Sequence, residues 1–157
     1  MEGPADRLRL LVLALQREAT RMLGALLRDD GLTAAQSEIL VVVGEHGPLT
    51  LKALGELILS ENASPSRAVD LLVRRGLLHR VTRPEDRRSV AIELTDRGRE
   101  MLPRISVAMQ KLAAPIRSSL SSDELATVTD LLGQLLTDKM SAEAIATRCR
   151  QGESAHV

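Results

Sequence analysis

The sequence of 157 residues contains no Phe, Tyr or Trp. Its core must therefore be built from Leu, Val, Ile, Ala and Met, which favours helices that present aliphatic stripes. The same absence argues against modules that recognise unpaired bases by stacking them on aromatic rings.

Cysteine is nearly absent as well, because Cys149 is the only one. A single cysteine excludes an intramolecular disulfide and fits a reducing compartment. The N-terminal apolar run LRLLVLAL contains Arg9 and continues into the polar segment QREATRM. This run is too short and too charged to cross a membrane, and no small-residue cleavage site follows it. We expect a soluble cytoplasmic protein.

Formal charge is balanced overall, with 21 basic and 21 acidic side chains, but it is unevenly distributed. Residues 63–99 hold 9 basic and 5 acidic side chains, a local net charge of +4. An anionic partner would meet that local excess.

Two amphipathic helices are predicted near the ends of the chain, over 5–29 and from Ser121 onward. Their apolar residues recur at steps of three and four, which indicates one apolar stripe on each helix. Each stripe could pack on its own domain or form a dimer platform with a second copy, and the pairing of two such helices favours the dimer. The predicted dimer residues are Leu8, Val12, Leu15, Leu125, Val128, Leu132 and Leu135.

The segment between them reads as three short helices. Thr33, with Gln36 three residues later, predicts a capped helix that ends at Gly47. Thr50 predicts the cap of a second helix, and Pro65 near the start of ASPSRAVDLLVRRG predicts the third, closed by Gly76. Three short helices in about 45 residues match the helix-turn-helix pattern.

A β-hairpin and a long helix are predicted next. Val90, Ile92 and Leu94 alternate with Ala91 and Glu93, as in a half-buried strand, and the turn PED joins this run to LLHRVTR. Thr95 predicts the cap of a helix that Pro103 and Pro115 should bend or break. The segment beyond about residue 148 is polar, and we expect it to fray.

Two clusters of side chains point to a nucleic-acid function. If the third short helix buries its apolar face, hydroxyls and an arginine at its start turn outward, where they can meet phosphates and base edges. Arginines crowd both flanks of the hairpin turn, where they would repel one another without an anionic partner. Asp86 could hold Arg88 in an extended pose. The candidate DNA contacts are Ser64, Ser66, Arg67, Arg74, Arg83, Asp86, Arg87 and Arg88.

The order of elements and the stretches GPLTLKALGELI, SRAVDLLVRRGLL and RPEDRRSVAIELTDRG resemble the MarR family of winged-helix transcriptional regulators, from about Leu32 to Leu102. The resemblance implies a homodimer that binds a palindromic promoter site, usually as a repressor. It also implies base contacts by Ser64, Ser66 and Arg67 and a wing-tip pair of Asp86 and Arg88. Relatives respond to small ligands in a cleft or to oxidants through a cysteine in the first helix, and this first helix has none.

Two departures keep an alternative open. Leu59 and Ser60 stand where the family usually has a glycine, and Pro65 replaces a small or β-branched residue. If these changes weaken DNA reading, the chain would be a winged-helix protein-interaction module instead.

Catalysis is not indicated. The three histidines are scattered, none has metal-ligand spacing with another, and no glycine-bracketed turn frames a nucleophilic serine. We expect no enzyme, no metal and no cofactor. The partners expected are double-stranded DNA and a second copy, with a small-molecule effector as an additional candidate.

The sequence thus predicts a mainly α fold with a small β-hairpin wing. The expected parts are an N-terminal dimerisation helix (1–30), a winged helix-turn-helix domain (31–96), C-terminal dimerisation helices (97–148) and a frayed tail (149–157).

Overall fold

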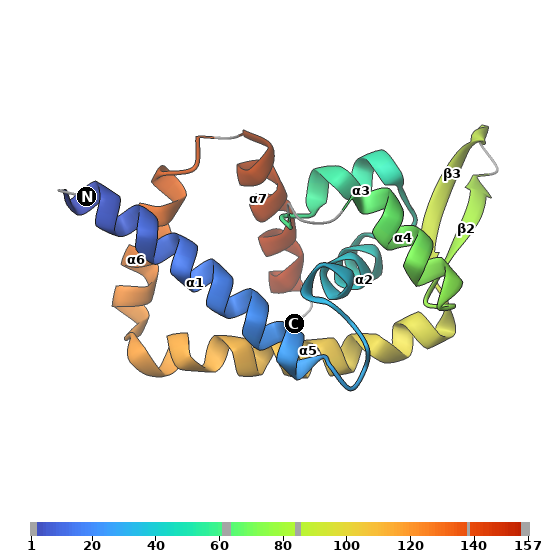
Figure 1. Ribbon diagram of the computed structural model, residues 1–157. Coiled ribbons are helices and arrows are strands. Elements are labelled where there is room, and N and C mark those ends of the chain that lie inside the picture. The colour runs from blue at the N-terminus through green and yellow to red at the C-terminus, as the bar shows by residue number, and fades with distance from the viewer. Residues whose placement is uncertain (1–2, 61–63, 84–85, 138, 155–157) are drawn as a thin grey trace.

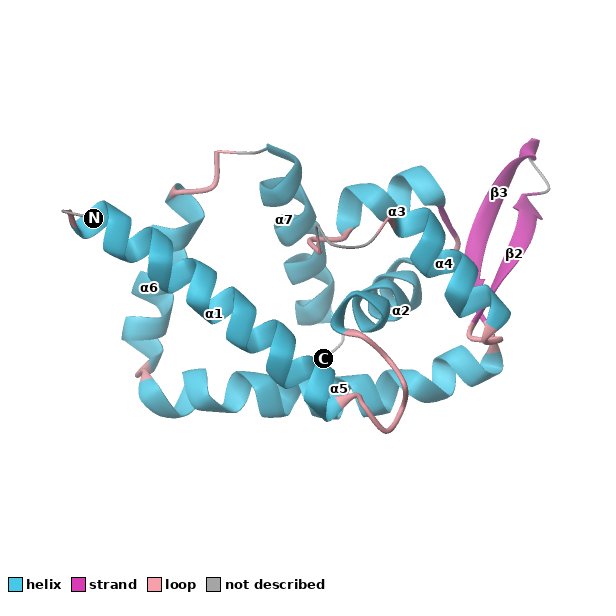
Figure 2. Cartoon of the chain, viewed as in Figure 1, coloured by secondary structure: helices cyan, strands magenta, loops and turns pink. Residues whose placement is uncertain are grey.

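A computed structural model describes residues 3–60, 64–83, 86–137 and 139–154; at 83, 86–89 and 150–154 the description covers the backbone alone. The chain is mainly helical with one small sheet (Figures 1 and 2). This agrees with the predicted mainly α fold that carries a β-hairpin. The helices are α1 (Pro4–Leu26), α2 (Ala34–His46), α3 (Leu51–Leu57), α4 (Pro65–Arg74), α5 (Asp96–Ser119), α6 (Ser122–Gln134) and α7 (Lys139–Ser154), and the strands are β1 (Leu49–Thr50), β2 (Leu78–Arg83) and β3 (Asp86–Leu94).

The sheet is antiparallel and its strand order is β1-β3-β2. The predicted hairpin of β2 and β3 is confirmed, with Leu78 opposite Leu94 and Val81 opposite Ala91. Strand β1 was not predicted, because two residues are too short to show an alternating pattern. It pairs with β3 through Leu49 and Ile92, and so fastens the hairpin to the body of the domain.

The predicted helix caps are all present. Thr33 and Ser121 each form a capping box, with Gln36 and Glu124 respectively. The hydroxyls of Thr50 and Thr95 accept the backbone N–H of the third residue of α3 and α5. Such caps satisfy donors that a helix start leaves without an intrahelical partner.

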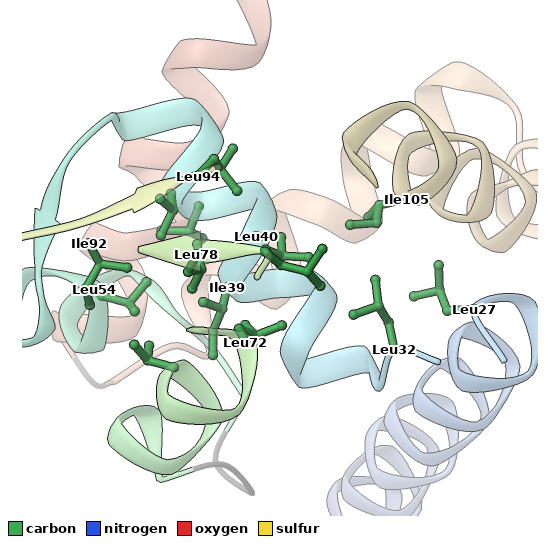
Figure 3. Close-up of a cluster of buried hydrophobic side chains, with 14 of the residues drawn as sticks. Leu27, Leu32, Ile39, Leu40, Leu54, Leu72, Leu78, Ile92, Leu94 and Ile105 are labelled. Carbon is green, nitrogen blue, oxygen red and sulfur yellow. The ribbon is translucent and has the colours of Figure 1, made fainter. Parts of the chain in front are cut away.

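One aliphatic core joins the helices to the sheet (Figure 3). Leu40, Leu54, Leu72 and Leu78 are fully buried and come from α2, α3, α4 and β2. Leu27 and Ile105 extend this core to the region where α1 meets α5. Because α4 buries Val69 and Leu72 in this core, its opposite face is fixed toward solvent.

The C-terminal half differs from the sequence expectations in two places, at the expected break in α5 and at the start of the expected frayed tail. Helix α5 runs without a break through Pro103 and Pro115. Both prolines lie on the exposed side, where water can bond the carbonyls that lose their N–H partners, while Ile105 and Ala108 hold the helix by packing. Helix α7 continues to Ser154, so the backbone of 149–154 is helical where fraying was expected. Residues 155–157 lie outside the described part.

Candidate nucleic-acid interface

Helix α4 presents a polar face to solvent. It buries Val69 and Leu72, whereas the predicted contacts Ser64, Ser66, Arg67 and Arg74 are all exposed. Ser64 is the N-cap residue but makes no side-chain capping bond, and Pro65 is the first helical residue. Proline costs little there because its missing N–H would have no intrahelical partner. The hydroxyls of Ser64 and Ser66 and the guanidinium group of Arg67 are thus offered at the start of the helix, which is a favourable place for phosphate, whereas Arg74 lies in its last turn.

Other charged groups near α4 have structural partners that the sequence did not reveal. Asp70 of α4 forms an ion pair with Arg80 of β2, which ties the helix to the hairpin. Arg75 donates to the backbone carbonyls of Asp30 and Gly31, at 2.9 and 2.7 Å, and so holds the loop that follows α1. Because Arg75 and Arg80 donate hydrogen bonds within the protein, they have fewer donors left for DNA.

The hairpin of β2 and β3 projects from the body beside α4 (Figure 1). The backbone of Arg83 pairs with that of Asp86 at the end of the ladder. The predicted cluster of Arg83, Asp86, Arg87 and Arg88 concerns side chains that lie outside the described residues, so it stays a prediction. Its support is the position of the hairpin, which extends away from the body on the side where α4 lies.

The base of the hairpin is fixed by two close contacts. The hydroxyl of Thr95 donates to the carbonyl of Gly76, at 2.7 Å, and accepts the N–H of Gly98. A Cβ atom at Gly98 would lie 2.1 Å from the carbonyl oxygen of Leu77, so only glycine fits where α5 begins. The hairpin, α4 and α5 therefore meet in one closely packed corner.

A large apolar surface lies on the opposite half of the molecule. Among the described residues of α6, none is buried, although the helix carries Val128, Leu131 and Leu132. Helix α1 buries only Leu23 and exposes Leu8, Val12 and Leu15. Of the other predicted dimer residues, Leu135 is exposed and Leu125 is half-buried. Exposed apolar area of this extent is unusual for a lone chain and typical of an interaction surface.

Other kinds of site find little support. The described residues contain no group of three or more His, Cys, Asp and Glu that could hold a metal ion. None of the described helices is long and apolar enough to span a bilayer. Cys149 is exposed. Open grooves among the described residues include one of about 330 Å³ beside Arg75, Arg97 and Arg104 and one of about 390 Å³ between α3 and α7.

Glu124, in the predicted platform, has a lowered pKa. The backbone N–H and then the hydroxyl of Ser121 lower the pKa of Glu124 below its ordinary value of 4.5. Hydrogen bonds to the charged form of a carboxyl have this effect. The carboxylate of Glu124 therefore stabilises the start of α6 and does not belong to the polar face of α4.

Comparison with known proteins identifies this combination of elements. The model of the MarR family matches residues 32–90. The chain is 32% identical over 104 residues to the organic hydroperoxide resistance transcriptional regulator of Bacillus subtilis, covering 62% of this chain and 71% of that protein. It is 28% identical over 122 residues to the uncharacterized HTH-type transcriptional regulator YhbI of the same organism, covering 78% and 79%.

Comparison with solved structures also points to the MarR family. The chain is similar to a cysteine-to-serine mutant of MarR from Escherichia coli in complex with operator DNA, with a TM-score of 0.74 and 27% identity over 83% of this chain and 94% of that one. The chain belongs to the MarR family of transcriptional regulators, which are not enzymes.

Proposed function

We propose that this protein acts in the cytoplasm as a homodimer that binds a palindromic site in double-stranded promoter DNA and represses transcription. The observation that carries the proposal is the exposed polar face of α4 beside a projecting hairpin. The MarR mutant from E. coli that this chain resembles was solved with operator DNA, which supports the same partner here.

Each α4 would enter a major groove, with Ser64, Ser66 and Arg67 near the base edges and Arg74 nearer the backbone. A bidentate arginine on guanine is the commonest specific contact of this kind. The hairpin would lie along the phosphates, with Arg83, Arg87 and Arg88 near the backbone or in the minor groove and Asp86 orienting Arg88. The two copies would place their α4 helices about 34–36 Å apart, one turn of DNA.

The dimer would be built on the exposed apolar residues of α1 and α6. A helix with no fully buried residue in its own chain has little to stabilise it there, because most helical stability in proteins comes from packing. A second copy offers the same apolar face, so a two-fold contact would cover both. Leu8, Val12, Leu15, Leu125, Val128, Leu132 and Leu135 belong to this proposed interface.

Relief by a small molecule is a further part of the proposal. An effector that binds one spacing of the two α4 helices better than another would shift that spacing, by no more than its differential affinity. With no aromatic side chain anywhere, aliphatic and methionine side chains would have to form the apolar part of such a site.

Footprinting on the DNA that flanks the gene, combined with mobility shifts over a range of salt, tests the function. A symmetric footprint and affinity that falls steeply with salt are expected. Changing Arg88 to Ala should reduce the slope of log affinity against log salt by about 1. A complete lack of binding at low salt would instead favour the protein-interaction module.

A further inference from the structure

Glu38 is a carboxylate buried at the centre of the helix-turn-helix. It lies on α2 within the apolar stretch SEILVVV, and only 8% of the whole residue is exposed. Acidic side chains are almost never buried without partners, so the groups that contact this one decide what it does.

Three of its contacts go to the turn that follows α3. One oxygen accepts the backbone N–H of Leu59, at 2.9 Å, and the other accepts the N–H of Ser60, at 3.1 Å. The hydroxyl of Ser60 donates to the second oxygen as well. The carboxylate therefore fixes the two residues that stand where the family usually has a glycine. Among the described residues, only glycines have a positive φ. The backbone of residues 58–60 therefore has a conformation that needs no glycine, and Glu38 accepts the N–H groups of this turn.

The fourth contact comes from the far end of the chain. Nη1 of Arg148, on α7, donates to Oε1 of Glu38 at 2.6 Å, and the two side chains are 20% and 11% exposed. Oε1 is the same oxygen that holds Leu59. A single carboxylate thus joins α7 to the turn that precedes α4.

Helix α7 is held near this turn by its contacts with α3 and by the Arg148–Glu38 ion pair. It packs beside α3 (Figure 1), yet an open groove of about 390 Å³ remains between them, lined by Leu57, Met140 and Ala144 among others. At its other end α7 follows α6, which has no buried residue among those described. Because α6 packs so little on its own chain, the position of α7 depends on α3 and on the ion pair of Arg148.

We propose that Arg148 is a positioning residue for DNA binding. Through Glu38 it holds the turn before α4, so that the orientation of α4 depends on the position of α7. If α7 moves away, Glu38 keeps its backbone donors but loses its only ion-pair partner among the described residues. The turn is then held less firmly, and α4 samples poses that fit the groove less well. The inference rests on the proposed DNA binding.

The test compares Arg148→Ala with Arg148→Lys and with Arg104→Ala. Arg104 serves as the control because its ion pair with Asp30 also spans 2.6 Å but lies away from the turn, with the Arg104 side chain 68% exposed. Two quantities are measured on the full chain: the affinity for the footprinted DNA by fluorescence anisotropy, and the hydrogen exchange of the Leu59 and Ser60 amides without DNA. Sedimentation checks that each variant keeps the oligomeric state of the wild type.

We expect Arg148→Ala to weaken DNA binding roughly 5- to 150-fold, the usual range for coupling between two sites. It should also speed exchange at Leu59 and Ser60. Arg148→Lys should restore part of both, since lysine keeps the charge but not the planar fork of donors. By reciprocity, DNA should slow exchange in α7 of the wild type and do so less in Arg148→Ala.

Unchanged affinity and unchanged exchange in Arg148→Ala would overturn the inference while leaving the proposed function intact. If Arg148→Ala changes only the stability of the fold, and its DNA affinity and amide exchange equal those of Arg104→Ala, the Arg148–Glu38 ion pair has only a structural role. That result would also overturn the inference. If the wild type binds no DNA, the proposed function fails, and the exchange measurement still decides whether Arg148 holds the turn.

Discussion

Replacing Leu15 by Asp should separate the proposed dimer. Leu15 lies on α1 and is 65% exposed in the single chain, which makes it one of the most exposed large apolar residues of α1 and α6. Any partner that covers this face would bury most of its side chain. The mutation replaces that burial by an ionised carboxylate that must be desolvated.

The size of the effect follows from that exposure. Complete burial of a leucine side chain stabilises by about 1.5–3 kcal/mol, so 65% of it corresponds to roughly 1–2 kcal/mol per copy. A two-fold interface contains the residue twice, which gives about 2–4 kcal/mol per dimer. The dissociation constant should rise by roughly 30- to 700-fold before the desolvation of Asp is added.

Sedimentation equilibrium over a range of concentrations measures this constant. Leu51→Asp is the control, because Leu51 is 39% exposed on α3 and an acidic residue in the first turn of a helix is favourable. It should dimerise as the wild type does. A Leu15→Asp chain that dimerises with an unchanged constant would show that α1 lies outside the interface and would refute the reasoning.

Three more predictions concern the reading helix, the packed corner and the cap of α6. Arg67→Ala should cost about 1–3 kcal/mol at the preferred DNA site and relax its specificity, and equal losses on random DNA in mobility shifts would assign Arg67 to phosphate contacts. Gly98→Ala should lower the free energy of unfolding, measured in urea, by about 1–3 kcal/mol because its Cβ would meet the Leu77 carbonyl. Gly55→Ala is the control: its Cβ meets nothing within 4 Å, so it should raise that free energy by up to about 1 kcal/mol. Equal effects of the two substitutions would contradict the close approach at Gly98. Because the pKa of Glu124 is lowered in the folded state, its support of α6 should be present above pH 4.5 and be lost as pH falls through the lowered value. In an NMR titration Ser121→Ala should raise that pKa and Ser122→Ala should not, and an unchanged value in both would remove the Ser121 hydroxyl as a cause.

Local signals in the sequence predicted most of the elements. Thr33, Thr50, Thr95 and Ser121 each begin a helix because a short polar side chain caps the N–H groups a few residues ahead, within reach of the same segment. The hairpin was predictable for a similar reason, since its alternating residues and its turn are contiguous.

Features that depend on distant residues were not predictable. Strand β1 exists because Leu49 meets Ile92, and the continuity of α5 at Pro103 depends on which side faces water. In the candidate site, the exposure of Arg67 and Arg74 follows from helical periodicity, but the ion pairs of Asp70 and Glu38 join residues from different elements. The acidic residue inside SEILVVV was the one available hint, because a buried carboxylate requires a partner.

The bare apolar surface of α6 has a consequence for mixtures of normal and altered chains. None of the proposed platform residues lies on α4, so a copy with a disabled α4 would still pair with a normal copy. Because a palindromic site needs both readers, each such hybrid would be poorly retained on its operator. A defect in Arg67 would then act dominantly in a cell that makes both forms, whereas a defect in Leu15 would be recessive.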